Sequence, residues 1–425
     1  MNTISDPGRL AQLMEQIRSV SPSGNWMKQA AELIVEQMLA AEVDERLGRA
    51  PYQRRGDQQA GYRNGFKSRG LKTAEGKLDI DLPQVRGMDE PYRSAVWEAL
   101  GKKTPALQKL ACEMYARGLS TRDIEELLGE IGGEIGGEAD ENGESQTLLS
   151  RSAVSRVTEA LWEEYEAFTK RDLSSFDVVY LFCDAVYESL RQQAGCRQAI
   201  MVTWAICSDG SKVLLHMSLG NKESAESWLE HFRSLVSRNL PTPITVTTDG
   251  APGLIKAVEA MWPEAERIRC WFHKMKNILE KVPDDQHELI KRLLQDVRDA
   301  PDHATGVRRV EELIENHQRE LPSAIACLKE DLEATLAHLK LPSLHQKMIR
   351  TTNLCERSFV EERRRTKVIP RFFDEKGCLK LVFATLWRAS QRWRGVRFTA
   401  MERQQLEAYL RIRRAAGAKV RELAA

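Results

Sequence analysis

Apolar residues recur every three or four positions through the first 170 residues of the chain, and the spacing changes near residue 177. The first spacing is that of an amphipathic helix with one buried face. It predicts helices over 26–48, 104–118 and 150–168, and another that starts at Ser120 or Thr121 in LSTRDIEELL. Ser and Thr side chains accept hydrogen bonds from the first free N–H groups of a helix, so they mark such starts. The front of the chain is therefore predicted to be mainly helical.

After residue 177 the sequence is rich in β-branched and aromatic residues, a composition typical of strands. Asp209-Gly210 separates the second and third of these runs and is a hairpin signal. The order of elements describes an α/β sheet of the ribonuclease H type, with an all-helical insertion before its last helices. Strands are predicted over 177–190, 197–212, 212–220, 243–251 and 267–273, and helices over 223–239, 274–345, 346–366 and 374–394.

These patterns divide the chain into consecutive regions. A helical and basic N-terminal region comes first, then a helix-turn-helix-like region that contains an acidic Gly/Glu insert at 129–146. The ribonuclease H-like catalytic domain follows in two parts separated by the helical insertion, and a basic helical tail ends the chain. The predicted boundaries are 1–100, 101–170, 171–273, 274–345, 346–395 and 396–425.

Charge is distributed unevenly, although the formal net charge is only +1. Residues 46–72 hold eight Arg or Lys and a single acid, Asp57, and residues 388–421 hold ten basic and two acidic residues. The acidic run 123–144 offsets them with nine acids and no base, and its glycines predict a solvated, flexible segment. A basic arm at 46–72 can follow DNA phosphates, and a solvated loop is the alternative.

Targeting signals are not evident in the sequence. The N-terminus lacks the basic start and apolar core of a signal peptide, and the longest apolar stretch, 198–208, is much shorter than the roughly 18 residues of a membrane span. The eight cysteines show no paired spacing that would indicate a disulfide framework. We expect a soluble cytoplasmic protein that associates with the nucleoid when it is bound to DNA and does not bind membranes.

The helices before residue 170 have the arrangement of a DNA-reading helix-turn-helix, with small polar and basic residues at the start of the last helix. Ser152, Ser155 and Arg156 are the predicted contacts there. An ordinary helical bundle is the alternative interpretation, and the acidic insert favours it.

Three acidic residues are placed where a sheet of this type performs metal chemistry. Asp184 is a charge within the apolar strand YLFCDAVY, Asp249 ends the strand ITVTTDGA, and Glu356 lies on a late helix. A buried carboxylate is costly unless a cation compensates it. Alone, Asp249 could form a turn and Glu356 could pair with an arginine. Together they predict a site for two Mg²⁺ ions, which Mn²⁺ can replace.

Cys270 and His273 are separated by two residues, a spacing that matches half of a zinc site. The sequence shows no second half, so a structural role near the carboxylates is the favoured interpretation. Asn353 lies on the same helix as Glu356, close to one turn before it.

Seven stretches of the chain resemble bacterial insertion-sequence transposases of the mutator type, a branch of the DDE transposases. They are GYRNGFKSRGLKT (61–73), GLSTRDIEELL (118–128), SAVSRVTEAL (152–161), LFCDAVYESLR (181–191), TTDGAPGL (247–254), RCWFHKMKNILEKVP (269–283) and TTNLCERSFVEERRRTKVIPRF (351–372).

The resemblance assigns the DDE positions to Asp184, Asp249 and Glu356, and it places Cys270 and His273 in the family's short Cys/His signature. It implies metal-dependent cleavage of double-stranded DNA at terminal inverted repeats, transfer of the freed 3′-hydroxyl to target DNA, and a homodimer. A catalytically silent or domesticated DNA-binding protein and a nonspecific ribonuclease H-like nuclease are the alternatives. Further DNA contacts are predicted at Arg54, Arg55, Arg63, Lys67 and Arg69 and, after Glu356, at Arg363, Arg364, Arg365 and Lys367.

Overall fold

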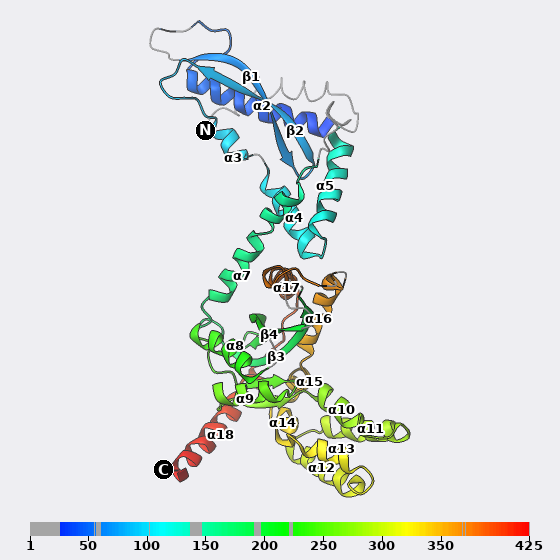
Figure 1. Ribbon diagram of the computed structural model, residues 1–425. Coiled ribbons are helices and arrows are strands. Elements are labelled where there is room, and N and C mark those ends of the chain that lie inside the picture. The colour runs from blue at the N-terminus through cyan, green and yellow to red at the C-terminus, as the bar shows by residue number, and fades with distance from the viewer. Residues whose placement is uncertain are drawn as a thin grey trace. The chain divides into compact units, whose positions relative to one another are not determined.

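The chain divides into two compact units, Met1–Ala160 and Leu161–Ala425. The structure, a computed structural model shown in Figure 1, describes residues 26–424 except 55, 57–60, 102, 137–146, 191–196, 221–223, 368 and 370. The division falls inside the region 101–170 that the sequence pattern delimits. No helix in the described part of the chain is long and apolar enough to cross a membrane.

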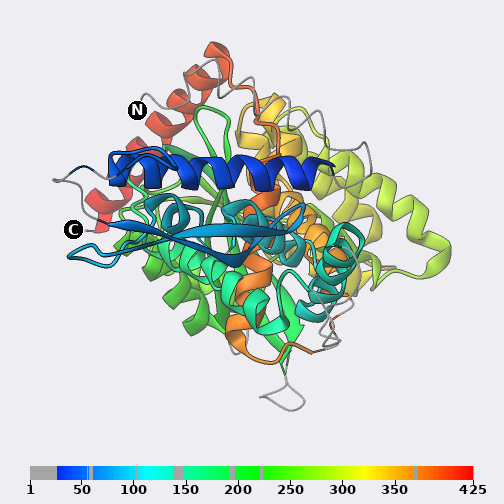
Figure 2. The same cartoon turned by 90° about the horizontal axis from the view of Figure 1, so that it is seen from above.

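The first unit begins with a helix packed on a two-stranded antiparallel ribbon. Helix α2 (Trp26–Leu47) runs along strands β1 (Tyr62–Thr73) and β2 (Gly76–Arg86), as Figure 2 shows. Leu39 of α2 packs with Leu71 and Ile80 of the ribbon in a small buried cluster. The alternative of a solvated loop over 46–72 is therefore wrong from Tyr62 onward. The alternation of a strand is hidden there because nearly all of β1 before Leu71 is solvent-exposed.

Three helices that share an apolar core complete the first unit. They follow the short helix α3 (Ala95–Leu100). Thr104 accepts the N–H of Leu107 at the start of the first, and Ser120 and Asp123 cap the second by exchanging hydrogen bonds. Side chains from all three helices and from the segment before α6 are fully buried together. The helices are α4 (Pro105–Ala116), α5 (Thr121–Gly136) and α6 (Arg151–Val157).

Two expectations about this region are corrected. Helix α5 continues to Gly136 and so enters the segment 129–146 that was predicted to be a flexible insert; residues 137–146 lie outside the described residues. The single helix predicted over 150–168 is two helices, α6 and α7 (Ala160–Lys170). The apolar period continues across the break, but α6 buries its side chains in the first unit and α7 buries its own in the second.

The second unit is built on a five-stranded mixed sheet with the order β5-β4-β3-β6-β7. The first three strands are antiparallel neighbours, and β6 and β7 run parallel to β3. Four strand predictions are confirmed. The fifth, over 267–273, is wrong at its end because the chain enters a helix at Trp271. The strands are β3 (Val178–Ser189), β4 (Arg197–Cys207), β5 (Lys212–Gly220), β6 (Thr245–Thr248) and β7 (Glu266–Arg269).

Helices cover both faces of this sheet (Figure 1). Successive side chains of a strand point to opposite faces. Leu181 and Cys183 of β3 pack in one core with α8 (Ala225–Ser237) and α9 (Pro252–Met261). The even-numbered residues of β3 face α16 and its neighbours, as Tyr180 does by hydrogen bonding His345. Helices α16 (Asn353–Thr366) and α17 (Glu375–Ser390) lie on this second face.

Residues 271–349 form helices, as their periodicity predicts, around a core of their own. A bidentate pair of Arg267 with Asp331 joins this helical segment to β7, with one bond at 2.6 Å. The helix predicted over 346–366 is interrupted at residues 350–352. The segment comprises α10 (Trp271–Leu279), η1 (Asp284–Gln286), α11 (His287–Arg298), α12 (His303–His317), α13 (Pro322–Lys329), α14 (Leu332–Leu336), η2 (Ala337–Lys340) and α15 (Ser343–Ile349).

The chain ends in a long helix, α18 (Ala400–Ala424). Its first half is tied to the sheet, since the Tyr409 hydroxyl donates to the Glu266 carboxylate at 2.8 Å and Arg413 pairs with the same carboxylate. Glu266 begins β7, so the C-terminal helix is anchored to the edge strand of the sheet.

Candidate active site beside strand β3 and the end of strand β6

Asp184 lies on β3, on the face of the sheet covered by α16. Only 7% of its surface is exposed, and its carboxylate accepts the N–H of Ala185 at 2.8 Å. Burial raises the pKa of Asp184 well above its usual range, and the negative charge of Asp249 raises it further. The carboxyl is therefore held in a place where a proton or a cation must compensate it.

Asp249 follows β6, which pairs with β3 in parallel register. Cys183 is the partner of Thr248, so the residues that come next in each strand, Asp184 and Asp249, are neighbours across the sheet. The carboxylate of Asp249 accepts the N–H of Ala251 at 2.9 Å, which forms a tight turn over Gly250. Gly250 has a φ of 87°, a conformation that residues with a Cβ rarely adopt. Two carboxylates from adjacent strands are thus neighbours, with Asp184 midway along β3 and Asp249 just after the end of β6.

Glu356 occupies the first turn of α16, which packs against β3. Its Oε1 lies 3.4 Å from the Thr352 hydroxyl, and the same Thr352 lies against the Cys270 thiol, with its N–H 3.4 Å from Sγ. Cys270 follows β7 directly, so these contacts connect the end of the sheet to the start of α16. Asn353, the first residue of α16, is exposed.

Cys270, His273 and Glu356 bring their ligand atoms within 4.8 Å of one another. In the described part of the chain this is the one group of three or more such side chains with that geometry, and Asp184 and Asp249 are outside it. A positive charge on His273 lowers the pKa of Asp184. The structure places the five predicted residues around the middle of β3, the ends of β6 and β7 and the first turns of α10 and α16, with Glu356 nearest the Cys/His pair.

The donors present suit two kinds of cation. Carboxylate oxygens on adjacent strands are ligands for Mg²⁺ or Mn²⁺, while a thiol and an imidazole favour softer ions such as Zn²⁺. Burial raises the pKa of Cys270, so a thiol rather than a thiolate is favoured there. The hard oxygen donors are the better fit, because Asp184 and Asp249 lie side by side and no cation of the chain hydrogen-bonds either one among the described residues.

Comparison with known sequences identifies the family. The sequence model of "Transposase, Mutator family" matches residues 7–395. The chain belongs to the mutator family of transposases.

Curated relatives agree with this assignment over most of their length. The transposase for insertion sequence element ISRM5 of Rhizobium meliloti is 29% identical over 88% of this chain and 89% of its own. The transposase for IS6120 of Mycolicibacterium smegmatis is 32% identical over 67% of this chain and 84% of its own. The transposase for IS256 in Tn4001 of Staphylococcus aureus is 25% identical over 89% and 94%, respectively. The chain is thus a DNA transposase, an enzyme that cleaves and transfers DNA.

The basic residues predicted to bind DNA from α16 fall into two groups. Arg364 and Arg365 both pair with Glu361, at 2.6 and 2.7 Å. Arg363 and Lys367 are exposed, and neither forms an ion pair among the described residues. The alternative of internally balanced charge therefore applies to Arg364 and Arg365, and not to Arg363 and Lys367.

The ribbon of the first unit shows a similar division. Lys67 and Arg69 are exposed on β1, and Arg54 is exposed before it. Arg63 instead donates to Asp44 and to the Arg49 carbonyl oxygen, both at 2.6 Å, so it has a structural role. Arg55 lies outside the described residues.

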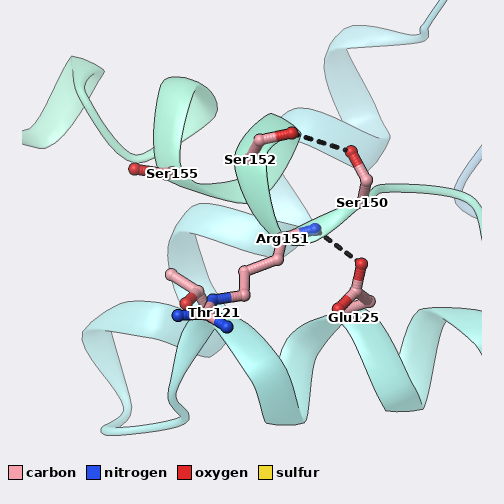
Figure 3. Close-up of a pocket in the computed structure, with 6 residues that line it drawn as sticks. All are labelled: Thr121, Glu125, Ser150, Arg151, Ser152 and Ser155. Carbon is pink, nitrogen blue, oxygen red and sulfur yellow. Dashed lines mark hydrogen bonds between the residues drawn. The ribbon is translucent and has the colours of Figure 1, made fainter.

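Ser152, Ser155 and Arg156 are exposed on α6. The two serines line an open polar pocket of about 520 Å³ between α5 and α6 (Figure 3). Its wall is fixed by the Glu125 carboxylate, which accepts the N–H of Arg151 at 2.8 Å. Glu125 thereby joins α5 to α6.

The sequence analysis missed two charged residues near the candidate active site in the second unit. Arg269 ends β7 beside the Asp249 turn, and Glu362 is a fully buried acid on α16. The signal for both was available, because each is a charge at a position that the pattern of its element buries.

Proposed function

We propose that Asp184, Asp249 and Glu356 are the metal-binding carboxylates of a ribonuclease H-like catalytic domain. In this proposal the transposase binds the terminal inverted repeats of its insertion sequence, cleaves the DNA strand there and joins the freed 3′ end to target DNA. The observation that carries it is the pair of carboxylates on adjacent strands, of which Asp184 is buried and has no ion pair among the described residues. The family supplies the DNA chemistry that such a pair can perform.

Two Mg²⁺ ions, replaceable by Mn²⁺, would be held by the three carboxylates; when bound, such ions activate a hydroxyl nucleophile and stabilise the leaving oxygen. The chain's own part is to place the ligands. The sheet fixes Asp184 and Asp249, and Thr352 orients Glu356 from the first turn of α16. His273 and Cys270 support this arrangement from β7 and α10, the structural role that we propose for them.

DNA recognition is assigned to the first unit. The three helices α4, α5 and α6 form one core and expose Ser152, Ser155 and Arg156 from the last helix, as a helix-turn-helix reader does. A two-stranded ribbon is also narrow enough for the major groove, and β1 presents Lys67 and Arg69. We propose that a homodimer of this kind holds the two ends of the element.

The test replaces each carboxylate by its uncharged isostere: Asp184→Asn, Asp249→Asn and Glu356→Gln. We expect each variant to bind element-end DNA as the unchanged protein does and to lose Mg²⁺-dependent cleavage by at least about 10³-fold, because metal ions supply several kcal/mol of charge stabilisation. Asp177→Asn is the matched control, an exposed aspartate just before the same strand.

Cleavage retained in any of the three variants would refute the site. Footprinting separates the alternative functions. Protection confined to an inverted repeat would exclude a nonspecific nuclease. Footprinted ends without cleavage or strand transfer by the unchanged protein would indicate a silent DNA-binding protein.

A further inference from the structure

Arg269 is a buried cation with no hydrogen-bond or ion-pair partner among the described residues. Only 7% of its surface is exposed, and its Nε is buried with no hydrogen-bond partner. None of the ion pairs among the described residues includes it. A buried charge is costly when nothing compensates it, so an arginine in this state is expected to have a partner that comes from outside the chain.

The neighbouring cations are already compensated. Arg267, two residues earlier on β7, pairs with Asp331 and Glu259. Lys274 donates to the carbonyl oxygens of Cys327 and Glu330, and its pKa is lowered by burial and, to a lesser extent, by the positive charge of Arg269. The positive charge of Arg269 thus acts on its neighbour Lys274, and no acidic side chain among the described residues pairs with it.

The backbone places Arg269 beside the candidate catalytic turn. Thr248 and Arg269 are register partners at the ends of β6 and β7, so Arg269 adjoins the segment Asp249-Gly250. The guanidinium occupies the space in which a Cβ of residue 250 would lie. Glycine, which has no Cβ, leaves that space open. Although Asp249 is adjacent, no hydrogen bond or ion pair between the two is found among the described residues.

We propose that Arg269 binds a phosphate group of the DNA strand held at the candidate active site. The proposal rests on the proposed function, because it requires DNA beside Asp184 of β3 and Asp249 after β6. A guanidinium fork matches the oxygens of a phosphodiester and is more weakly hydrated than an ammonium, which suits a buried position. Arg269 is therefore a DNA-binding residue adjacent to the carboxylates, in addition to the basic residues that the sequence predicted.

The experiment is a double-mutant cycle between the protein and single phosphates. The full-length protein, unchanged or as Arg269→Gln, is given element-end duplexes that carry one neutral methylphosphonate at successive positions around the cleavage site. Single-turnover cleavage and equilibrium binding by fluorescence anisotropy are both measured. Lys256→Gln is the matched control, an exposed cation on α9 of the same unit. Arg269→Lys tests whether charge suffices without the fork.

We expect one phosphate position at which neutralisation slows the unchanged protein about tenfold and leaves Arg269→Gln unaffected. In Lys256→Gln the same neutralisation should retain its full effect, since groups without a shared partner act additively. Additive effects of Arg269→Gln at every position would overturn the proposal. If Arg269→Gln does not fold by circular dichroism, Arg269→Lys completes the cycle, with a reduced coupling at one phosphate as the expected result.

The outcome is separable from that of the proposed function. Should Asp249→Asn cleave DNA normally, the carboxylate assignment fails, whatever Arg269 does. Should the unchanged protein bind but not cleave, the anisotropy data alone decide whether Arg269 and one phosphate are coupled.

Discussion

Glu362 makes the stability of the second unit dependent on pH. It is fully buried on α16, and neither of its carboxyl oxygens has a hydrogen-bond donor among the described residues. Glu188 of β3 is its neighbour and accepts the Thr366 hydroxyl at 3.1 Å. Two carboxyl groups in contact cannot both be charged at low cost, so Glu362 keeps its proton and can donate it to Glu188.

The size of the effect follows from the proton balance. Burial and then Glu188 raise the pKa of Glu362 from 4.5 to about 8, against the smaller opposing effects of Thr366 and Arg363. Between these two pH values the folded state binds a proton that the unfolded chain has released. The contribution of Glu362 to the free energy of unfolding should therefore be greatest below pH 4.5 and decrease as the pH rises to about 8, by at most about 1.4 kcal/mol per pH unit.

Glu362→Gln removes the titrating group and retains a donor for Glu188. We expect urea unfolding, followed by tryptophan fluorescence at pH 5, 6, 7 and 8, to show a decline for the unchanged protein that is smaller in the variant. Glu361→Gln is the matched control, since Glu361 is only half-buried and pairs with Arg364 and Arg365. Parallel pH profiles for the unchanged protein and Glu362→Gln would refute a protonated, shared pair.

Two further predictions concern the ribbon and the turn. The double variant Lys67→Gln/Arg69→Gln should reduce the slope of log DNA affinity against log salt concentration by up to about 1.8, because each residue that contacts a phosphate contributes about 0.9. Lys77→Gln is the control and should leave the slope unchanged, because Lys77 already pairs with Asp79. Equal slopes in all three proteins would exclude the ribbon from the DNA interface. Gly250→Ala should lower the free energy of unfolding by roughly 1–3 kcal/mol and impair cleavage, because residue 250 has a φ of 87° and a Cβ there would overlap the Arg269 guanidinium. Unchanged thermal unfolding and cleavage would contradict this geometry.

The central elements of the second unit were predictable because their residues are buried on both faces. Strand β4 is buried from Gln198 to Cys207, and a run of β-branched and aromatic residues is then a strong signal. The β1–β2 ribbon gave no such signal, since β1 is exposed until Leu71 and its glycines suggest a loop. Local patterns report burial, and a solvent-exposed strand has little of it.

The break between α6 and α7 was unpredictable for a different reason. Ala153 and Val154 belong to the core of the first unit, while Leu161 and Tyr165 are buried in the second. Each half has the period of a helix, and the point at which the buried face changes partner is a tertiary property. The end of β7 is similar, because Cys270 still donates its N–H to Thr248 while Trp271 already packs in the helical core.

The candidate site shows what one consistent rule would have added. Asp184 attracted attention as a charge inside an apolar strand, and the same rule applied to RIRCWFH selects Arg269, which is buried at the end of β7. The same rule applied to α16 selects Glu362, a charged residue on the helix face that packs against β3. The sequence could not show their neighbours, because Gly250 and Glu188 are 19 and 174 residues away and meet them only through the sheet and α16.

Cys270 illustrates how the family signature can act without a metal of its own. Its thiol accepts the Thr352 N–H at 3.4 Å and lies 3.6 Å from the Thr352 hydroxyl, and that hydroxyl lies 3.4 Å from Glu356. A zinc ion on Cys270, His273 and Glu356 would require a thiolate where burial favours the thiol, and it would occupy the carboxylate that the proposed Mg²⁺ site needs. The hydrogen bonds through Thr352 already fix the start of α16 to the end of β7. In the structural role that we propose for it, Cys270 would determine the position of Glu356 relative to Asp184 and Asp249.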